Sequence, residues 1–264
     1  MGHPKKSLGQ NFLMHPRIAE RIVMVANLPE NATVLEIGPG TGMLTRALLA
    51  KAARVIAVEA DDQLIPELAE TFADEIEKGR LELVHADIRT FDPARITGSY
   101  GLVANIPYYI TGEIMRMFLT APHKPYSMTV LVQKEVAERV ARSRGKESIL
   151  SLSVKAYGTP TYAFTVPRGA FRPAPNVDSA VLSIQDIRGD CFESLADEEA
   201  FFEVLKAGFA HKRKRLAKNL EALVSGEAAK TLLQEAGVMP DARSEDVDLA
   251  SWKRLAHTAR KLRK

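Results

Sequence analysis

The sequence predicts an α/β protein, in which helices cover a mostly parallel sheet and a small helical domain follows. Three observations support this prediction. Short apolar runs rich in β-type residues alternate with segments of helical period through the first two-thirds of the chain. A glycine-rich turn at residues 38–42 directly follows one of those runs. Beyond about Arg188 the strand signals stop, while the helical periodicity continues.

Apolar runs of strand length predict five strands, at residues 33–37, 54–58, 81–85, 102–105 and 129–132. Apolar residues with a period near 3.6 predict helices next to them, at 15–27, 43–51, 62–76, 112–119 and 134–142. Asp61 and Asp62 stand at the start of the third helix, where carboxylates are common N-cap groups. Strands and helices in alternation favour parallel pairing, because each helix returns the chain to the same end of the sheet.

Two further runs, at 162–166 and 177–187, are expected to close the sheet as an antiparallel hairpin. We therefore expect two domains. Residues 1–187 would form the sheet domain with an N-terminal arm, and residues 188–264 would form the helical domain after a weak linker at Gly189-Asp190.

The composition of the chain excludes several classes of protein and of site. The net charge of +3 is too small to indicate a polyanionic partner by itself. Cys191 is the only cysteine, which excludes an intrachain disulfide and fits a reducing compartment such as the cytoplasm. The six histidines lack metal-site spacing, so no metal is expected. No apolar run is long enough to cross a bilayer or to act as a signal peptide, so neither membrane insertion nor secretion is expected.

A cofactor site is expected at the turn Gly38-Pro39-Gly40-Thr41-Gly42, because glycines allow the backbone to approach a ligand closely. Glu59 ends the next strand, at about the distance (~20 residues) where dinucleotide folds place an acid on ribose hydroxyls. Asp87 closes the third strand in the same way. These features alone also suit an NAD-binding domain. The Gly-X-Gly-X-Gly spacing and the motif that ends the fourth strand favour S-adenosylmethionine instead.

Glu36 precedes the first glycine and has two interpretations. Its carboxylate would suit the amino-acid end of S-adenosylmethionine through a water molecule. The alternative is an acid that braces the loop.

The motif Asn105-Ile106-Pro107-Tyr108 combines an amide, a proline and an aromatic ring, as nitrogen methylation of a flat base requires. The amine of adenine is a poor nucleophile, so its protons need acceptors, and the Asn105 side chain and the Ile106 carbonyl are candidates. Pro107 fixes φ and helps to hold that carbonyl toward a pocket, while Tyr108 offers a ring on which an extruded base can stack. The alternative is an ordinary turn after a buried strand, with half-buried tyrosines.

Beyond the strands, a cluster of cations without intervening acids indicates contact with RNA phosphates. It comprises Lys212, Arg213, Lys214, Arg215 and Lys218. The alternative is a solvated helix face.

Several motifs are similar in order and spacing to the KsgA family, the small-subunit ribosomal RNA adenine dimethyltransferases. They are Gln10-Asn11-Phe12-Leu13, Glu36-Ile37-Gly38-Pro39-Gly40-Thr41-Gly42, Glu59, Asp87, Asn105-Ile106-Pro107-Tyr108, the segment 133–139 and Phe171-Arg172-Pro173-Ala174-Pro175-Asn176-Val177-Asp178-Ser179. Segments 209–215 and 242–245 resemble the helical C-terminal domain of that family, so the resemblance spans nearly the whole chain. The chain departs at Tyr109, where the family often has asparagine, and at Ser148-Ile149-Leu150-Ser151, where it often has Gly-Arg-Leu-Ser.

The resemblance implies a Rossmann-like class I methyltransferase domain with a small all-helical C-terminal domain. It implies that Asn11, Leu13, Gly38, Gly40, Glu59, Asp87 and Asn105 line the S-adenosylmethionine site, with Glu59 on the ribose and Asp87 on the adenine amine. Tyr108 and Phe171 would enclose the target adenine, although Phe171 is also a candidate core residue of the hairpin loop.

The implied substrate is a pair of adjacent adenosines in a hairpin near the 3′ end of small-subunit ribosomal RNA, in a pre-ribosomal particle. Each would become N6,N6-dimethyladenosine, through the action of a monomeric enzyme. Three alternatives remain: an erythromycin-resistance type methylase of large-subunit RNA, an assembly factor without catalysis and an NAD-dependent dehydrogenase. The basic cluster and Arg243-Ser244-Glu245 favour the small subunit.

Overall fold

The computed structural model describes residue 5 and residues 8–142 and 146–262. The chain divides into two compact units, one of residues 1–137 and 158–187 and the other of residues 138–157 and 188–264. The sequence predicts a boundary at 187 and 188, and the structure also assigns residues 138–157 to the helical unit. This happens because the helix α7 (Ile149–Tyr157) packs against helices that follow residue 188.

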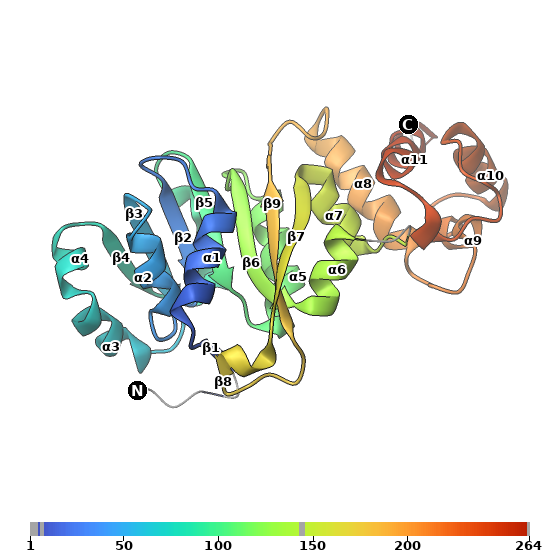
Figure 1. The fold of residues 1–264 in the computed structure, drawn as a ribbon. Helices are drawn as coiled ribbons and strands as arrows, with labels where there is room; N and C mark the ends of the chain where they lie inside the picture. Colours follow the sequence, from blue (N-terminus) through green and yellow to red (C-terminus); the bar gives the residue numbers. More distant parts are fainter. Residues whose placement is uncertain (1–4, 6–7, 143–145, 263–264) are drawn as a thin grey trace. The chain divides into compact units, whose positions relative to one another are not determined.

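Among the described residues of the first unit, seven strands form one sheet in the order β4-β3-β2-β5-β6-β9-β7 (Figure 1). Their bounds are β2 (Thr33–Ile37), β3 (Arg54–Glu59), β4 (Leu81–His85), β5 (Tyr100–Asn105), β6 (Ser127–Gln133), β7 (Thr159–Val166) and β9 (Ser179–Gln185). The first five pair in parallel, and β9 runs antiparallel to both β6 and β7. The predicted sheet with its closing hairpin is therefore confirmed.

Helices cover both faces of this sheet (Figure 1). On one face the apolar residues of α1 (Pro16–Ala26), α2 (Met43–Leu49) and α3 (Leu64–Thr71) form a core with alternate strand residues such as Val34 and Val103. The opposite set of strand residues, such as Leu35 and Leu102, is also fully buried, and α5 (Thr111–Thr120) lies on that face. The helix α6 (Lys134–Ala141) follows β6.

The helix predicted over 62–76 is two helices, α3 and α4 (Ala73–Glu77), with the break at Phe72. The ring of Phe72 packs into the space beside Gly42, and its backbone leaves helical geometry at φ −116° and ψ 25°. The predicted N-cap role of Asp61 and Asp62 is wrong, because Gln63 is the N-cap residue and makes no side-chain cap. The Asp61 carboxylate accepts from the backbone N–H of Gln63 and is also held by Gln10 and Lys5 of the N-terminal segment.

A second small sheet pairs β1 (Phe12–Leu13) with β8 (Phe171–Arg172). Two-residue strands leave no periodic signal, so the sequence does not predict them. Short 3-10 helices complete the connections at Ile88–Thr90, Pro93–Arg95, Tyr108–Ile110, Arg168–Ala170 and Ser244–Asp246.

The second unit is helical, as predicted, and contains α7, α8 (Leu195–Gly208), α9 (Leu216–Leu220), α10 (Gly226–Glu235) and α11 (Leu249–Leu262). Ser194 and Ser225 cap α8 and α10 through their hydroxyl groups. Trp252 is fully buried against Gly208, where any larger side chain would collide with its ring. No described helix combines the length and the apolar character that crossing a membrane requires.

Candidate active site

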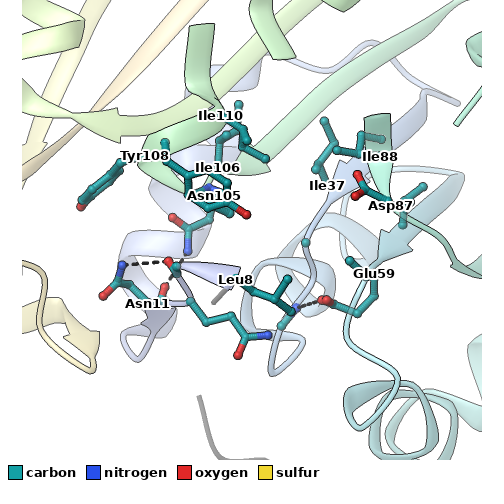
Figure 2. A pocket seen from close by; sticks show the side chains of 18 of the residues that line it. Leu8, Asn11, Ile37, Glu59, Asp87, Ile88, Asn105, Ile106, Tyr108 and Ile110 are labelled. Carbon is teal, nitrogen blue, oxygen red and sulfur yellow. Dashed lines mark hydrogen bonds between the residues drawn. The ribbon is translucent and has the colours of Figure 1, made fainter. Parts of the chain in front are cut away.

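The carboxyl ends of β2, β3, β4 and β5 meet at one edge of the sheet, where α/β folds bind ligands. A cavity of about 840 Å³, including space open to solvent, lies at this edge (Figure 2). Most of the predicted site residues line it: Asn11, Gly38, Gly40, Glu59, Asp87, Asn105, Ile106, Pro107 and Tyr108. In Figure 2 Tyr108 and Asn105 lie on one side, and Glu59 and Asp87 lie on the other.

The glycine turn after β2 has a backbone conformation in which residues other than glycine would be strained. Gly38, Gly40 and Gly42 have φ values of +65°, +60° and +78°. A Cβ atom at Gly40 would lie 2.9 Å from the Phe12 ring, and one at Gly42 would lie 2.5 Å from the Phe72 ring. The turn therefore allows both a close backbone approach to a ligand and tight packing of two aromatic rings.

Glu59 places a fixed carboxylate at the cavity wall. Its side chain accepts hydrogen bonds from the backbone N–H of Gly40 at 3.1 Å and of Asp61 at 2.9 Å. Burial raises the pKa of Glu59, and these N–H groups oppose the rise. Each carboxylate oxygen retains a further lone pair, which suits the paired hydroxyls of a ribose.

Asp87 lies on the same side of the cavity, but both its oxygens are engaged by Arg89. The Arg89 side chain donates through Nε at 3.0 and 3.1 Å and through Nη2 at 2.5 Å. The bond from Arg89 lowers the pKa of Asp87 despite partial burial. An adenine amine would have to share this carboxylate with Arg89. Arg89 belongs to no recognisable motif, so the sequence does not predict its place in the site.

The Asn105 side chain is oriented by the N-terminal arm. Its Nδ2 donates to the carbonyl oxygen of Asn11 at 2.9 Å, and this bond fixes which end of the amide carries the acceptor Oδ1 (Figure 2). Asn11 in turn donates through Nδ2 to the carbonyl of Gly9 at 3.2 Å. The predicted acceptor is therefore held in one orientation.

Tyr108 is half-buried, and its hydroxyl lies 2.6 Å from the Ser179 hydroxyl at the start of β9. Burial raises the pKa of Tyr108, so the hydroxyl is neutral at physiological pH. The hydrogen bond restricts the ring to one position at the cavity wall. Tyr109 is exposed, and its ring lies against Gly9.

Two predicted residues lie outside this cavity. Leu13 is buried and lines a smaller pocket beside the glycine turn, which Asn105 also lines. Phe171 is 4% exposed and belongs to the hydrophobic core around α1 and α2. The structure thus places the Phe171 ring in the core, in line with the alternative that the sequence leaves open, and its stacking on the target adenine stays a prediction.

The predicted basic cluster lies in the helical unit. Lys212, Arg213, Lys214 and Arg215 are exposed in the connection between α8 and α9. Lys218 is exposed on α9 and pairs with Glu221 at 2.5 Å, which offsets part of its charge. Ion pairs with acidic side chains are not observed for the first four among the described residues.

Glu36 is fully buried in β2 and does not line the cavity. Neither carboxylate oxygen has a hydrogen-bond partner of normal geometry within the described part of the chain. Burial raises the pKa of Glu36 to about 8, while the nearby Thr45 hydroxyl opposes the rise and Glu59 adds to it. A carboxyl in this setting is largely protonated at neutral pH.

The cavity walls include apolar residues that the sequence analysis missed, among them Ile37, Val58 and Ile88. Each lies at or just after the end of a strand. The sequence does not distinguish these apolar residues from ordinary core residues. Within the described residues no group of three or more His, Cys, Asp or Glu side chains could hold a metal ion.

The model of the family described as "Ribosomal RNA adenine dimethylase" matches residues 1–261. The chain is 42% identical to ribosomal RNA small subunit methyltransferase A of Dehalococcoides mccartyi strain BAV1, over 95% of this chain and 87% of that protein. It is 39% identical to the protein of the same name from Streptococcus gordonii, over 96% of this chain and 90% of that protein.

Two solved structures are similar over nearly the whole chain. The 23S rRNA methyltransferase ErmE has a TM-score of 0.76 and 29% identity, covering 95% of this chain and 100% of that one. A dimethyladenosine transferase from Plasmodium falciparum has a TM-score of 0.78 and 25% identity, covering 92% and 95%.

Proposed function

The chain belongs to the ribosomal RNA adenine dimethylase family, and we infer from this membership that it is a methyltransferase that uses S-adenosylmethionine to dimethylate adenine in ribosomal RNA. We propose that its targets are two adjacent adenosines in a hairpin near the 3′ end of small-subunit RNA, in a pre-ribosomal particle. The observation that carries the assignment is the position of Asn105. Its amide lies in the same cavity as Glu59 and the glycine turn.

S-adenosylmethionine fits the groups that line this cavity. The turn leaves room for close backbone contact at Gly38, where no atom lies within 4 Å of the position of a Cβ, and Glu59 offers a buried carboxylate to a ribose. Apolar side chains such as Ile88 and Ile106 provide walls for a flat ring. Once bound, this cofactor supplies a strongly electrophilic methyl group.

The protein must bring the adenine amine into line with that methyl group and exclude water. The Asn105 Oδ1 and the Ile106 carbonyl accept hydrogen bonds from the amine and direct its lone pair, while the Tyr108 ring supports the extruded base. Alignment of this kind contributes up to roughly 7–11 kcal/mol in well-oriented cases. A strong general base is unnecessary, because the methylated amine releases its proton readily.

The choice of small-subunit RNA rests on the curated relatives. They are named for the small subunit, and this chain matches nearly their whole length. The likeness to ErmE makes large-subunit RNA the second candidate, because that structure is titled a 23S rRNA methyltransferase. The exposed cations at 212–215 are proposed to hold the RNA backbone, and Leu13 to support the cofactor site from beneath the glycine turn. A monomer is sufficient for these roles.

Mass analysis of ribosomal RNA nucleosides tests the assignment. The protein is incubated with S-adenosylmethionine and with small-subunit or large-subunit precursors in parallel. We expect N6,N6-dimethyladenosine in small-subunit RNA alone. Product in large-subunit RNA alone would transfer the assignment to the second candidate, and product in neither RNA would contradict both.

A further inference from the structure

We propose that Asp61 is a positioning residue that fastens the N-terminal arm over the cofactor cavity and slows the departure of the cofactor. The arm is defined here as Lys5 and residues 8–13, and the arm clamp as Lys5, Gln10 and Asp61. The proposal rests on the proposed function, because it takes the ligand of the cavity to be S-adenosylmethionine.

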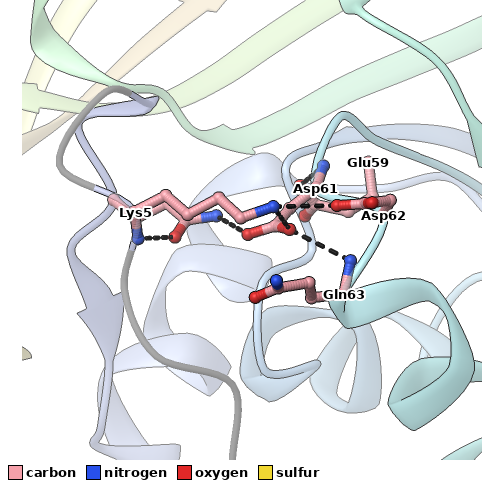
Figure 3. Close-up of polar contacts among 6 residues, drawn as sticks. Lys5, Glu59, Asp61, Asp62 and Gln63 are labelled. Carbon is pink, nitrogen blue, oxygen red and sulfur yellow. Dashed lines mark hydrogen bonds and ion pairs between the residues drawn. The ribbon is translucent and has the colours of Figure 1, made fainter.

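The arm clamp joins the arm to Asp61, just after β3, through two direct contacts, and a third contact links Lys5 to Gln10 within the arm (Figure 3). The Lys5 ammonium lies 2.7 Å from Asp61 Oδ1, and the Gln10 Nε2 donates to Asp61 Oδ2 at 2.8 Å. The Lys5 backbone N–H donates to Gln10 Oε1 at 2.6 Å. Asp61 also accepts from the backbone N–H of Gln63 at 3.1 Å. The two arm residues are thereby tied to each other and to one carboxylate.

The Lys5–Asp61 contact differs from an ordinary surface ion pair because Asp61 is buried. The Asp61 side chain is 2% exposed, whereas the neighbouring Asp62, which also contacts Lys5 at 2.8 Å, is 71% exposed. Burial would raise the pKa of Asp61, yet the bonds from Lys5, Gln10 and Gln63 together hold it below its ordinary value. A buried carboxylate that loses its partners is costly, so the closed position of the arm is favoured.

The fastened arm forms part of the cavity wall. Residues 8–12 all line the cavity. Glu59, two residues before Asp61, also lines the cavity. At the far end, the Asn11 carbonyl accepts from Asn105, and β1 pairs with β8. Gly9 packs against the Tyr109 ring between these two points. The arm therefore crosses the cavity from the cofactor side to the acceptor side and is anchored at both.

This geometry separates release of the ligand from the transfer step. Detaching the arm clamp frees the wall on the Glu59 side, while the Asn105 contact with Asn11 remains. We expect the loss of the clamp to raise the dissociation rate of S-adenosylmethionine and its KM, and to leave the single-turnover rate at saturating cofactor unchanged. If Asp61 had a purely structural role, its substitution would lower thermal stability without raising the dissociation rate and KM selectively.

The test measures dissociation of labelled S-adenosylmethionine from the full-length protein during a chase with unlabelled cofactor. Asp61→Asn should raise the rate about tenfold, since hydrogen bonds to a charged group are involved. Lys5→Met removes a charge whose side chain is 32% exposed, and it should raise the dissociation rate about threefold, as expected for a partly exposed ion pair. In the double variant the two effects should be less than additive, because both substitutions remove the Lys5–Asp61 contact.

Glu82→Gln is the matched control, because it breaks the Arg54–Glu82 ion pair at 2.6 Å on the same sheet, away from the arm. We expect its dissociation rate to equal that of the unmodified protein. A Lys5→Met variant with an unchanged dissociation rate would overturn the proposal, whether or not Asp61→Asn folds. If the unmodified protein fails to bind S-adenosylmethionine at all, the proposed function itself is contradicted, and the two failures are thus distinguishable.

Discussion

At the residue scale, the site consists of polar groups whose partners fix their direction. Asn105 is held by the Asn11 carbonyl, Glu59 by two backbone N–H groups, and Tyr108 by Ser179. Such support matters because catalytic groups that are held in place need no rearrangement when the substrate arrives.

The Tyr108–Ser179 contact predicts a coupled pair of substitutions. Tyr108→Phe and Ser179→Ala each remove the same 2.6 Å hydrogen bond, so each should raise the KM for RNA by a factor of about 3 to 10, the worth of one such bond. The double variant should be no worse than either single variant. Methylation kinetics across RNA concentrations measure this. Ser183→Ala, on the same strand, is the control, and fully additive effects would refute the coupling.

The residues of the site were predictable where a motif joins a residue type to a strand end. Glu59, Asp87 and Asn105 each stand at or just after such an end, and the structure brings them to one cavity. Arg89 and Asp61 were not predictable as site residues, because their importance depends on partners that only the fold brings together. Phe171 shows the reverse case, since its motif gives no information on which way the ring points.

At the element scale, the strand β2 contains a fully buried carboxyl group, that of Glu36. Its sequence reads as a short buried strand, and all its described residues except Thr33 are buried, the carboxyl included. A raised pKa in the folded state makes stability depend on pH.

The expected dependence follows from the sign of the shift. Below about pH 4.5, the ordinary value, both states hold the proton and stability is unaffected; between 4.5 and about 8 the unfolded chain loses it while the folded protein keeps it. Stability should therefore fall as pH rises through this window, by about 2–4 kcal/mol between pH 5 and 8. Urea unfolding at several pH values measures this. Glu36→Gln should remove that part of the dependence, and parallel pH profiles for the two proteins would contradict it.

The connection between α8 and α9 predicts a change in RNA affinity. Reversing Lys212 and Arg213 to Glu should weaken binding of small-subunit RNA about tenfold or more. It should lower the salt slope by about 1.4–1.8, because each of the two lost phosphate contacts contributes ~0.7–0.9. Binding titrations across salt concentrations check this. The control reverses Lys206 and Lys230, two exposed lysines on neighbouring helices. Equal losses in both variants would show a general charge effect instead.

Elements were predictable in proportion to their length and period. Every strand of the main sheet was expected, because each is an apolar run of normal length. The break at Phe72 was not, since it depends on the space beside Gly42. Pairing of β1 with β8 involves two residues on each side and gives no periodic signal.

At the scale of the whole molecule, one edge of the first unit holds both the groups proposed for the cofactor and those proposed for the acceptor amine. The order of the strands achieves this, since β5 lies next to β2 although β3 and β4 intervene in the sequence. Alternation of strands and helices predicted the architecture, and the motifs predicted residues that the structure brings to one cavity. The assignment of residues 138–157 to the helical unit depends on tertiary packing alone. The role of that unit in binding RNA remains our proposal.

Asn105 is proposed to direct an adenine amine toward the methyl group. The most direct test is the single-turnover rate of methyl transfer from labelled S-adenosylmethionine to small-subunit RNA precursors by Asn105→Ala, with cofactor affinity measured on the same protein. We predict a fall of about 100-fold or more in the rate, as for other lost polar groups of this kind, with cofactor affinity reduced less than about tenfold. An unchanged single-turnover rate would contradict the account.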